Sequence, residues 1–580
     1  MAAADTDVLI IGAGMSGIGF AIQLQNKYKH ASFEIYEKGT EVGGTWAVNT
    51  YPGCGVDVPS HFYSYSFGLN PHWTRKFTMQ PEILAYFKDV SRQHDIDPHI
   101  RFQHSVTKAE WQSESSTWLI TIHNHRTNKI TQRRANILIS AVGALSIPKK
   151  CEVPGHETFE GNIFHSATWD HSFDHTGKNL VVLGNGCSAT QFVPVIAQTA
   201  RSVTQFARQP HWLLERPNPE YSTLFRFMMR WVPGAMTLLR TIIYAQLEAE
   251  WLMFNTATGK DARQKLSDAS KKYIEENAPA EYVDVLVPKF EVGCKRRVFD
   301  TGYLEALHRP NLHLISDDPV ERIGRHSVFL RSGKELPADA IVLATGFETT
   351  KLLAPMEIIG LEGKTVEDHW NNHNDGLPQA YYGTCIAGFP NMFIMMGPNT
   401  LTGHLSVTWS TECQINFTLR VIDPVLRSLH PPRISLWPSQ RVEAVQVKQQ
   451  AEDEENSWIQ SKCKRLVWSS GCSNWYVEPK TGKNLLIYPE WQWHFWLRSI
   501  FIRWGDFRFV SDLKRGGSIS PLWALLPAFA GLSFILDKSA ISSVWRLLND
   551  KLALSVATPS QLGLNGLKQS ENNSTISSGV

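Results

Sequence analysis

Two glycine-rich loops, each directly after a short apolar strand pattern, constrain this 580-residue sequence more than any other feature. The first has Gly12, Gly14 and Gly17 in the spacing GxGxxG, after the run 7–11 and before a helical pattern. In a nucleotide-binding unit, Gly12 makes the tight turn, Gly14 lets backbone N–H groups approach a pyrophosphate, and Gly17 lets helix and strand pack closely. The next strand pattern ends at Glu37, where a carboxylate accepts hydrogen bonds from ribose hydroxyls. This region predicts a parallel α/β unit that binds a dinucleotide.

The second loop follows the apolar run 180–183 and carries Gly184, Gly186 and Ser188, with Ala189 in the third glycine position. The strand pattern after it leads to Arg208 instead of an acidic residue. A guanidinium suits a 2′-phosphate, and a charged hydrogen bond of about 1.5–3 kcal/mol favours NADPH over NADH. A solvated arginine at the end of a strand is the simpler alternative. We therefore expect FAD at the first loop and NADPH at the second.

The length requires several domains, and the two loops predict an α/β fold with two Rossmann-like dinucleotide-binding domains. We place the first part of the FAD domain at 1–150 and the NADPH domain at 151–337. A helical subdomain is expected within the latter, at about 220–285, because residues 221–254 are apolar, with arginines at helical spacings. Core packing, a substrate-funnel wall and membrane contact are alternative interpretations of it. The run 338–347 is expected to return the chain to the FAD domain, whose second part is 338–515.

Composition excludes several partners. A formal net charge of +2 without a basic run argues against nucleic acid, and the eight scattered cysteines form no zinc or dithiol pattern. No metal is expected, and the cysteines predict a reduced, cytoplasmic protein. The segment 516–536 is uncharged, and its apolar part, 521–536, is interrupted by Pro527 and Gly531. It favours peripheral membrane contact or packing over a span, and the rest of 516–580 ends in a disordered tail.

Three further motifs carry a family resemblance. Phe159, Gly161, His165, Trp169 and Asp170 fit the fingerprint FxGxxxHxxxW(P/D) of type I Baeyer–Villiger monooxygenases, in the flavin-containing monooxygenase superfamily. A second family motif is matched by Gly43, Gly44, Thr45, Trp46, Tyr51, Pro52, Gly53 and Asp57. The segment 293–303 resembles a third motif, although Arg297 stands where the family has proline, which leaves open whether Arg296 or Arg297 faces the flavin.

The resemblance implies that NADPH reduces FAD and that O2 then gives a C4a-peroxyflavin, which attacks a ketone to yield an ester or lactone. Arg296 would stabilise the peroxide and the adduct, while Asp57 would hold Arg296 and balance its charge. Lys295 would reach the NADPH 2′-phosphate alongside Arg208, with Gln209 beside it, and Trp475 would cover the nicotinamide nucleotide. Gly44, Thr45, Trp46 and the turn containing Asn399 are placed in the cofactor site.

Alternatives remain from the sequence alone. Related monooxygenases that hydroxylate nitrogen or sulfur have a fingerprint ending in an aromatic residue and Lys/Arg, whereas Trp169-Asp170 favours the Baeyer–Villiger reaction. Asp57 and Arg296 can also be read as a structural ion pair. His165 is assigned a positioning or hinge role, since the fingerprint lies between domains in this family. The aromatic-rich insertion suggests a bulky apolar ketone, such as a specialised metabolite, as substrate. The sequence does not reveal the oligomeric state.

Overall fold

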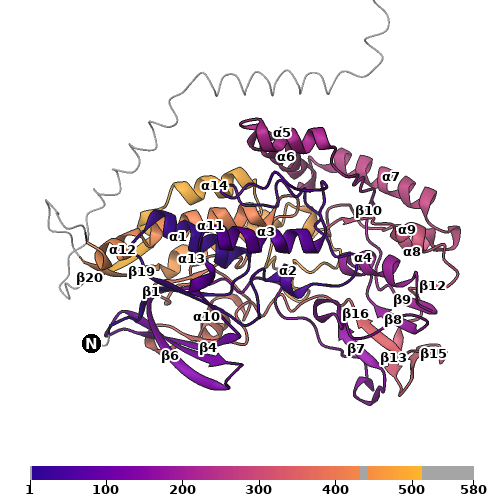
Figure 1. Ribbon diagram of the computed structural model, residues 1–580, viewed down its shortest axis with the longest axis horizontal. Helices are drawn as coiled ribbons and strands as arrows, with labels where there is room; N and C mark the ends of the chain where they lie inside the picture. Colours follow the sequence, from indigo (N-terminus) through magenta and orange to yellow (C-terminus); the bar gives the residue numbers. More distant parts are fainter. Residues whose placement is uncertain (1–2, 432–440, 512–580) are drawn as a thin grey trace, which may run out of the picture. The chain divides into compact units, whose positions relative to one another are not determined.

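The first glycine loop connects the central strand of a mixed sheet to its packed helix in the computed structural model, which describes residues 3–431 and 441–511 (Figure 1). The sheet order is β17-β4-β5-β6-β1-β2-β3, with β18 beside β6. β1, β2 and β3 are parallel, whereas β4, β5 and β6 form an antiparallel meander. The strands are β1 (Thr6–Ile11), β2 (Phe33–Glu37), β3 (Ile100–Phe102), β4 (His104–Gln112), β5 (Thr117–Asn124), β6 (Lys129–Ser140), β17 (Glu357–Ile359) and β18 (Met392–Ile394).

The first loop needs glycine because two backbone segments approach each other closely there. A Cβ atom at Gly17 would lie 1.9 Å from the carbonyl oxygen of Gly12, so only glycine lets α1 (Met15–Lys27) pack this near the strand. α11 (Val407–Val421) lies beside α1, and the Tyr28 hydroxyl donates to the Leu419 carbonyl at 2.9 Å. The remaining helices of this part are α2 (Thr45–Val48), α3 (Gln80–Gln93), α10 (Val366–Asn374), α12 (Asp423–Leu429), α13 (Gln449–Cys463) and α14 (Gln492–Ile500).

The second glycine loop belongs to a five-stranded parallel sheet, with the order β12-β9-β8-β16-β7. Its strands are β7 (Asn162–His165), β8 (Asn179–Leu183), β9 (Ser202–Phe206), β12 (Leu312–Ile315) and β16 (Ala340–Leu343). β16 pairs with both β7 and β8, so it is an inner strand of this sheet. The predicted boundary between 337 and 338 therefore falls one strand too early, because an apolar run reads the same in either sheet.

Helices α5 (Thr223–Trp231), α6 (Ala235–Ala249), α7 (Lys260–Asn277) and α8 (Val283–Leu286) follow one another between β10 (Leu213–Leu214) and β11 (Val298–Phe299). The expected fold class, two Rossmann-like units with a helical insertion, is confirmed. The other elements are α4 (Cys187–Ile196), α9 (Tyr303–Ala306), the hairpin strands β13 (Val320–Ile323), β14 (Ser327–Leu330) and β15 (Glu335–Pro337), and the pair β19 (Val442–Val447) and β20 (Phe507–Ser511).

No helix in the described ranges, 3–431 and 441–511, has both the length and the apolar character to cross a membrane. The predicted apolar segment 521–536 and the tail lie outside these ranges.

One apolar core joins the two sheets. It includes Ile10 and Phe20 at the first loop, Val182 and Phe192 at the second, and Tyr51 between them. The Tyr51 hydroxyl donates to Gln191 Oε1 at 2.9 Å, and its ring meets Phe192 of α4 edge-on, at 6.0 Å. The segment 50–57 of the first part is thus docked on α4 of the second.

We expect Gly53→Ala to weaken this docking. Gly53 has a φ of 77°, and an added Cβ would lie 2.4 Å from the Gln191 carbonyl oxygen. The positive φ costs an alanine about 1–2 kcal/mol, and the overlap adds about 1–3 kcal/mol. Gly143→Ala is the matched control, because Gly143 has a φ of 79° and no neighbour within 4 Å of the added atom. Thermal unfolding should show a larger loss for Gly53→Ala, and equal losses would contradict the close docking.

Candidate active site

The first loop contacts the glycine pair of the second motif. Gly43 donates its N–H to the Ala13 carbonyl at 3.0 Å, and Gly44, at the start of α2, lies against Gly14. Glu37 lies at the end of β2, where its carboxylate accepts the Ala13 N–H at 2.7 Å and the Gly39 N–H at 2.6 Å. A carboxylate has about four acceptor positions, so ribose binding by Glu37 remains a compatible prediction.

A hydrogen bond connects the second motif to Tyr63, whose pKa is affected by the charges of the predicted catalytic pair. Thr45 and Trp46 begin α2, and the Trp46 indole donates to the Tyr63 hydroxyl at 3.1 Å. Burial, mainly, raises the pKa of Tyr63 to about 12, with Asp57 and Arg296 among the charges acting on it. Tyr63 therefore contacts the flavin motif and is affected by the charges of the ion pair, which the sequence did not suggest.

Arg296 and Asp57 form the expected pair. Nε and Nη2 of Arg296 each lie 2.7 Å from Asp57 Oδ2, and both side chains are partly buried. Asp57 is the main cause that raises the pKa of Arg296, so the guanidinium keeps its charge. Arg297 pairs with Glu250, which directly follows α6 within the helical insertion. Of the two arginines that the sequence left open, the structure places Arg296 against Asp57.

The second loop brings α4 to the same pair. Cys187 begins α4, and its thiol, whose pKa burial raises to about 11, is also affected by the charges of Asp57 and Arg296. A Cβ at Gly186 would meet no heavy atom within 4 Å, so the backbone before α4 faces open space, as a pyrophosphate site requires. Gly184, with a φ of 116°, comes directly after β8, and Ser188 lies in the first turn of α4.

Two cations and an amide gather at the end of β9. Lys295 Nζ donates to Gln209 Oε1, and the Asn185 side-chain amide donates to the Gln209 backbone carbonyl oxygen at 2.8 Å. Burial first, and then the charge of Arg208, lowers the pKa of Lys295 to about 8. Repulsion between neighbouring cations is relieved when an anion binds, so Arg208, Gln209 and Lys295 suit a phosphate group.

The fingerprint residues lie at the junction between the domains. His165 ends β7, its Nδ1 accepts the Ala167 N–H at 3.0 Å, and its ring lies 5.7 Å from Phe347. Trp169 packs on Phe192 of α4 at 5.2 Å, and Asp170 accepts the Ser172 N–H at 2.9 Å. Phe159 and Gly161 lie just before β7, and a Cβ at Gly161 would be 2.4 Å from the Asp339 carbonyl oxygen. These contacts agree with a positioning or hinge role for His165.

Asn399 and Trp475, which the sequence places in the cofactor sites, contact other residues of the protein. Asn399 is buried, and its amide donates to the Asn484 carbonyl at 2.8 Å, so it holds the turn 397–400 against residues 484–487. Trp475 is partly exposed and packs on Tyr476, which is buried close to Arg296. Their cofactor contacts remain predictions.

The sequence predicts a reduced protein, and one pair of cysteines departs from this prediction. Cys294 and Cys472 form a disulfide, which connects the segment before Lys295 to the loop before Trp475. The two residues are 178 positions apart, so no spacing rule finds them. Sequence reasoning also missed Arg216, whose Nη1 donates to the Val56 carbonyl at 3.0 Å, directly before Asp57.

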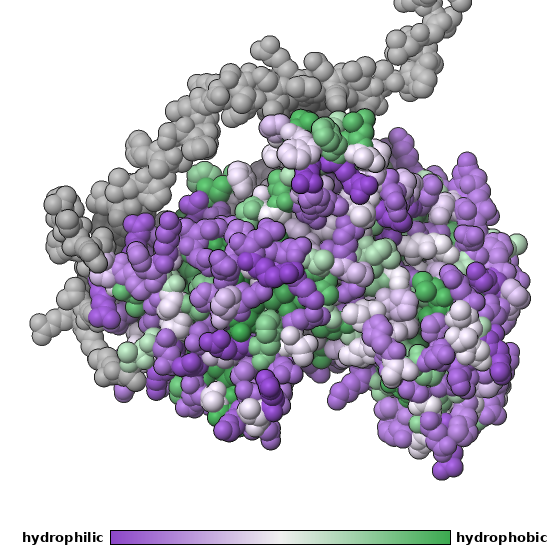
Figure 2. Space-filling view, in the orientation of Figure 1, coloured by the Kyte–Doolittle hydropathy of each residue, from purple (hydrophilic) through white to green (hydrophobic). Residues whose placement is uncertain are grey.

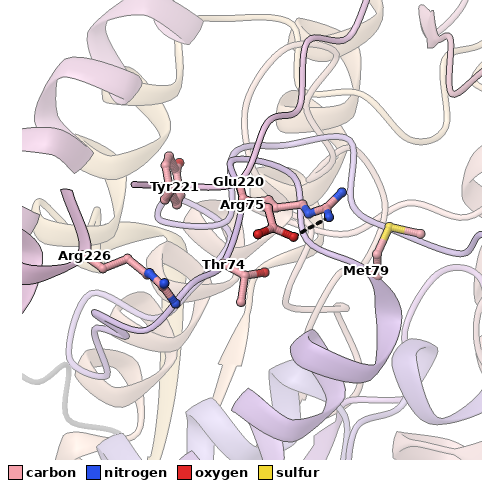
Figure 3. A pocket seen from close by; sticks show the side chains of 6 residues that line it. All are labelled: Thr74, Arg75, Met79, Glu220, Tyr221 and Arg226. Atoms are coloured by element: carbon pink, nitrogen blue, oxygen red, sulfur yellow. Dashed lines mark hydrogen bonds and ion pairs between the residues drawn. The ribbon is translucent and has the colours of Figure 1, made fainter. Parts of the chain in front are cut away.

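A cavity of about 370 Å³ at the start of α5 is lined by none of the predicted cofactor residues (Figure 3). Arg75 and Glu220 form an ion pair of 2.7 Å in its wall. Thr74, Met79, Tyr221 and Arg226 complete the lining.

Two glycine loops of the dinucleotide-binding type, and an ion pair that joins Asp57 of the first part to Arg296 of the second, suit a protein that brings two nucleotide cofactors together. A model of the flavin-binding monooxygenase-like family matches residues 5–260. The Baeyer–Villiger monooxygenase of Pseudomonas aeruginosa is 34% identical over 496 residues, which cover 85% of this chain and 89% of that protein. The chain therefore belongs to the Baeyer–Villiger monooxygenases of the flavin-binding monooxygenase family, and the expected enzyme class is confirmed.

Other relatives agree. The Baeyer–Villiger monooxygenase of Streptomyces coelicolor is 34% identical over 492 residues, with 83% of this chain and 88% of that protein covered. The FAD-binding monooxygenase ktnD of Aspergillus niger is 33% identical over 525 residues, with 88% and 82% covered. The fold resembles OTEMO complexed with FAD and NADP, with a TM-score of 0.76, 24% identity, and 88% and 100% of the two chains covered.

We expect NADP⁺ binding to weaken as pH rises through about 8. Lys295 is protonated below its pKa of about 8 in the free protein, and only the charged form attracts a 2′-phosphate. The dissociation constant of NADP⁺, measured by titration of the oxidised protein, should rise up to about tenfold per pH unit above that value.

Lys295→Gln should bind NADP⁺ weakly and without this pH dependence, whereas Lys295→Arg should bind tightly at high pH, because arginine keeps its charge. Arg208→Ala should weaken NADP⁺ far more than NAD⁺. An unchanged pH profile in Lys295→Gln, or equal losses for both nucleotides in Arg208→Ala, would contradict this assignment.

We expect loss of the Cys294–Cys472 disulfide to destabilise the protein. Cys472→Ser should lower the free energy of unfolding by about 2–4 kcal/mol, and reductant should have a similar effect on the unmodified protein. Cys151→Ser is the control, because Cys151 is a free cysteine that is not fully buried. Denaturant titration checks this, and the same midpoint for Cys472→Ser and the unmodified protein would contradict the role of the disulfide.

Proposed function

We propose that this protein catalyses the NADPH- and O2-dependent Baeyer–Villiger oxidation of a ketone, with FAD at the first loop. One oxygen atom of O2 is inserted between the carbonyl carbon and a neighbouring carbon, which gives an ester or lactone. The other atom leaves as water, while NADPH and a proton supply the two electrons and the two hydrogens. Bound FAD would accept the electrons from NADPH and activate O2.

The position of the Asp57–Arg296 pair carries this proposal. Asp57 comes from the segment docked on α4, and it pairs with Arg296. Arg296 follows directly after Lys295, which together with Arg208 and Gln209 forms the group that we call the phosphate cluster. Tyr63, which accepts a hydrogen bond from Trp46 of the flavin motif, and Cys187 of the second loop are both near enough to the pair to be affected by its charges. These relations support a position of the cation between the two expected dinucleotide sites.

Arg296 would stabilise the negative charge that develops on oxygen when the carbonyl is attacked. A cation that is held in place before the reaction stabilises such charge without reorganisation, and in many enzymes this stabilisation makes the greatest contribution to the rate. A guanidinium has five N–H donors, so its contact with Asp57 leaves donors for the reacting oxygen. Asp57 fixes the orientation of Arg296 and reduces the cost of burying it.

The phosphate cluster supports NADPH as the reductant. Arg208 and Lys295 supply the positive charge for a 2′-phosphate, and Gln209 orients the lysine. The name of the Aspergillus niger relative and the nucleotides in the OTEMO structure are consistent with FAD and NADPH here.

A bulky apolar ketone, such as a specialised metabolite, is the substrate we favour. The insertion contributes Tyr244, which lies 4.8 Å from Trp409 in the first turn of α11, where Phe62 also packs. Large aromatic surfaces near a flavin site suit an apolar ligand. We also favour a cytoplasmic location because six of the eight cysteines are free, with the Cys294–Cys472 disulfide as the exception.

We expect Arg296→Ala to retain FAD and its reduction by NADPH but to lose ketone oxygenation by about 100-fold or more, since removal of one preorganised donor has this effect. Cyclic and aryl ketones are suitable probes, with ester formation followed by gas chromatography and NADPH consumption by absorbance. Arg297→Ala is the matched control, because Arg297 pairs with Glu250 and not with Asp57.

Ester formation by Arg296→Ala at the normal rate would overturn the role of Arg296. Turnover of sulfides or amines without any ester from ketones would instead favour the hydroxylating alternative.

A further inference from the structure

Helices α5 and α6 form a hairpin, residues 223–249, whose inner side is firmly attached to the rest of the protein. Arg240 donates to the carbonyl oxygens of His61 at 2.6 Å and Ser64 at 3.0 Å. At the end of α6, Glu248 accepts the Gln492 N–H at 2.7 Å. These contacts give the hairpin a fixed orientation, so its other side is presented on a rigid support.

The outer side of the hairpin is apolar. Leu224, Phe227 and Trp231 are 68%, 57% and 61% exposed, and with Met228 they recur at the spacing of one helical face. Leu238, which is 63% exposed, and Ile242 repeat the spacing on α6. Exposed apolar patches of this kind mark interaction surfaces on proteins. Figure 2 shows apolar residues at this end of the molecule, next to strongly hydrophilic ones.

The charge of the hairpin selects the kind of partner. The stretch 223–247 contains Arg226, Arg230 and the inward Arg240 but no aspartate or glutamate. Arg226 and Arg230 are both at least partly exposed, and the Arg230 guanidinium lies 5.0 Å from the Trp231 ring. An apolar stripe with Trp and Phe, bordered by arginines, is typical of helices that lie in the interface of an anionic membrane.

Other occupants fit less well. A second copy of the hairpin would bring the same arginines together, without acidic residues from either copy between 223 and 247 to neutralise them. The apolar segment 521–536 of this chain has no charged residue, so it would leave Arg226 and Arg230 without partners from that segment. Lipid phosphates satisfy the arginines, and acyl chains satisfy the apolar stripe.

We propose that the α5–α6 hairpin docks this protein on the surface of an anionic phospholipid bilayer. The stripe of Leu224, Phe227, Trp231 and Leu238 enters the boundary between headgroups and acyl chains, and Arg226 and Arg230 bind lipid phosphates. The hairpin lies on the bilayer and does not cross it, because α5 and α6 have 9 and 15 residues, fewer than the roughly 20 that a span needs.

Flotation of the full-length holoprotein with vesicles tests this proposal. Phosphatidylcholine vesicles with about 30% phosphatidylserine should carry the protein upward, and pure phosphatidylcholine should carry much less. Phe227→Ser with Trp231→Ser and Leu238→Ser should reduce partitioning by about 100-fold or more, since each side chain buries apolar area. Arg226→Gln with Arg230→Gln should reduce it by about 10- to 30-fold on anionic vesicles only.

Ile130→Ser with Phe501→Ser is the matched control, because these side chains are 70% and 59% exposed outside the hairpin and should not affect partitioning. Circular dichroism and FAD content confirm that each variant is folded. Failure of the unmodified protein to float, or normal flotation of the triple hairpin variant, would overturn the proposal.

Two further arms separate the other occupants. If Trp523→Ser with Phe534→Ser abolishes flotation while the triple hairpin variant floats normally, the C-terminal segment binds the lipid and the proposal is wrong. If light scattering without vesicles shows a dimer that the triple variant converts to a monomer, the hairpin binds a second copy and the proposal is also wrong.

Discussion

The docking of residues 50–57 on α4 is the constraint on which the rest of the site depends. It relies on a hydrogen bond from Tyr51 to Gln191, on the edge contact of Tyr51 with Phe192, and on a glycine where a side chain would collide with α4. These contacts position Asp57 beside Arg296. Because the same α4 begins at the second glycine loop, one interface determines both how the charged pair forms and where it lies relative to the second loop.

The electrostatic arrangement divides the cations between two tasks. Arg296 is paired with a carboxylate, so its charge is fixed and its direction is controlled. Lys295, one residue earlier, has an amide partner and a neighbouring arginine, and its pKa is lowered to about 8. Of these two cations, Lys295 is therefore the one whose charged form an incoming anion stabilises more. Adjacent residues in one segment thus serve as a permanent cation and a ligand-dependent one, and the Cys294–Cys472 disulfide anchors that segment.

Much of the fold and site was predictable because the relevant signals are local. A glycine is required wherever the backbone must turn or approach within a few ångströms, so both nucleotide loops were found from spacing alone. The run 338–347 was placed in the wrong sheet, since β16 is apolar on both faces and such a strand fits either parallel sheet. Glu37, Asn399 and Trp475 were located by pattern, but the pattern did not reveal the neighbours that the fold gives them.

The sequence by itself determined that two dinucleotides are expected, that an arginine and not a carboxylate follows the second strand pattern, and which family motifs are present, because these depend on residue types at short spacing. Only the tertiary structure decided that Arg296, and not Arg297, meets Asp57, and that Cys294 bonds to Cys472. It also decided which side of the α5–α6 hairpin faces outward. Each of these depends on contacts between segments far apart in the chain, and no local periodicity encodes which distant residue becomes the neighbour.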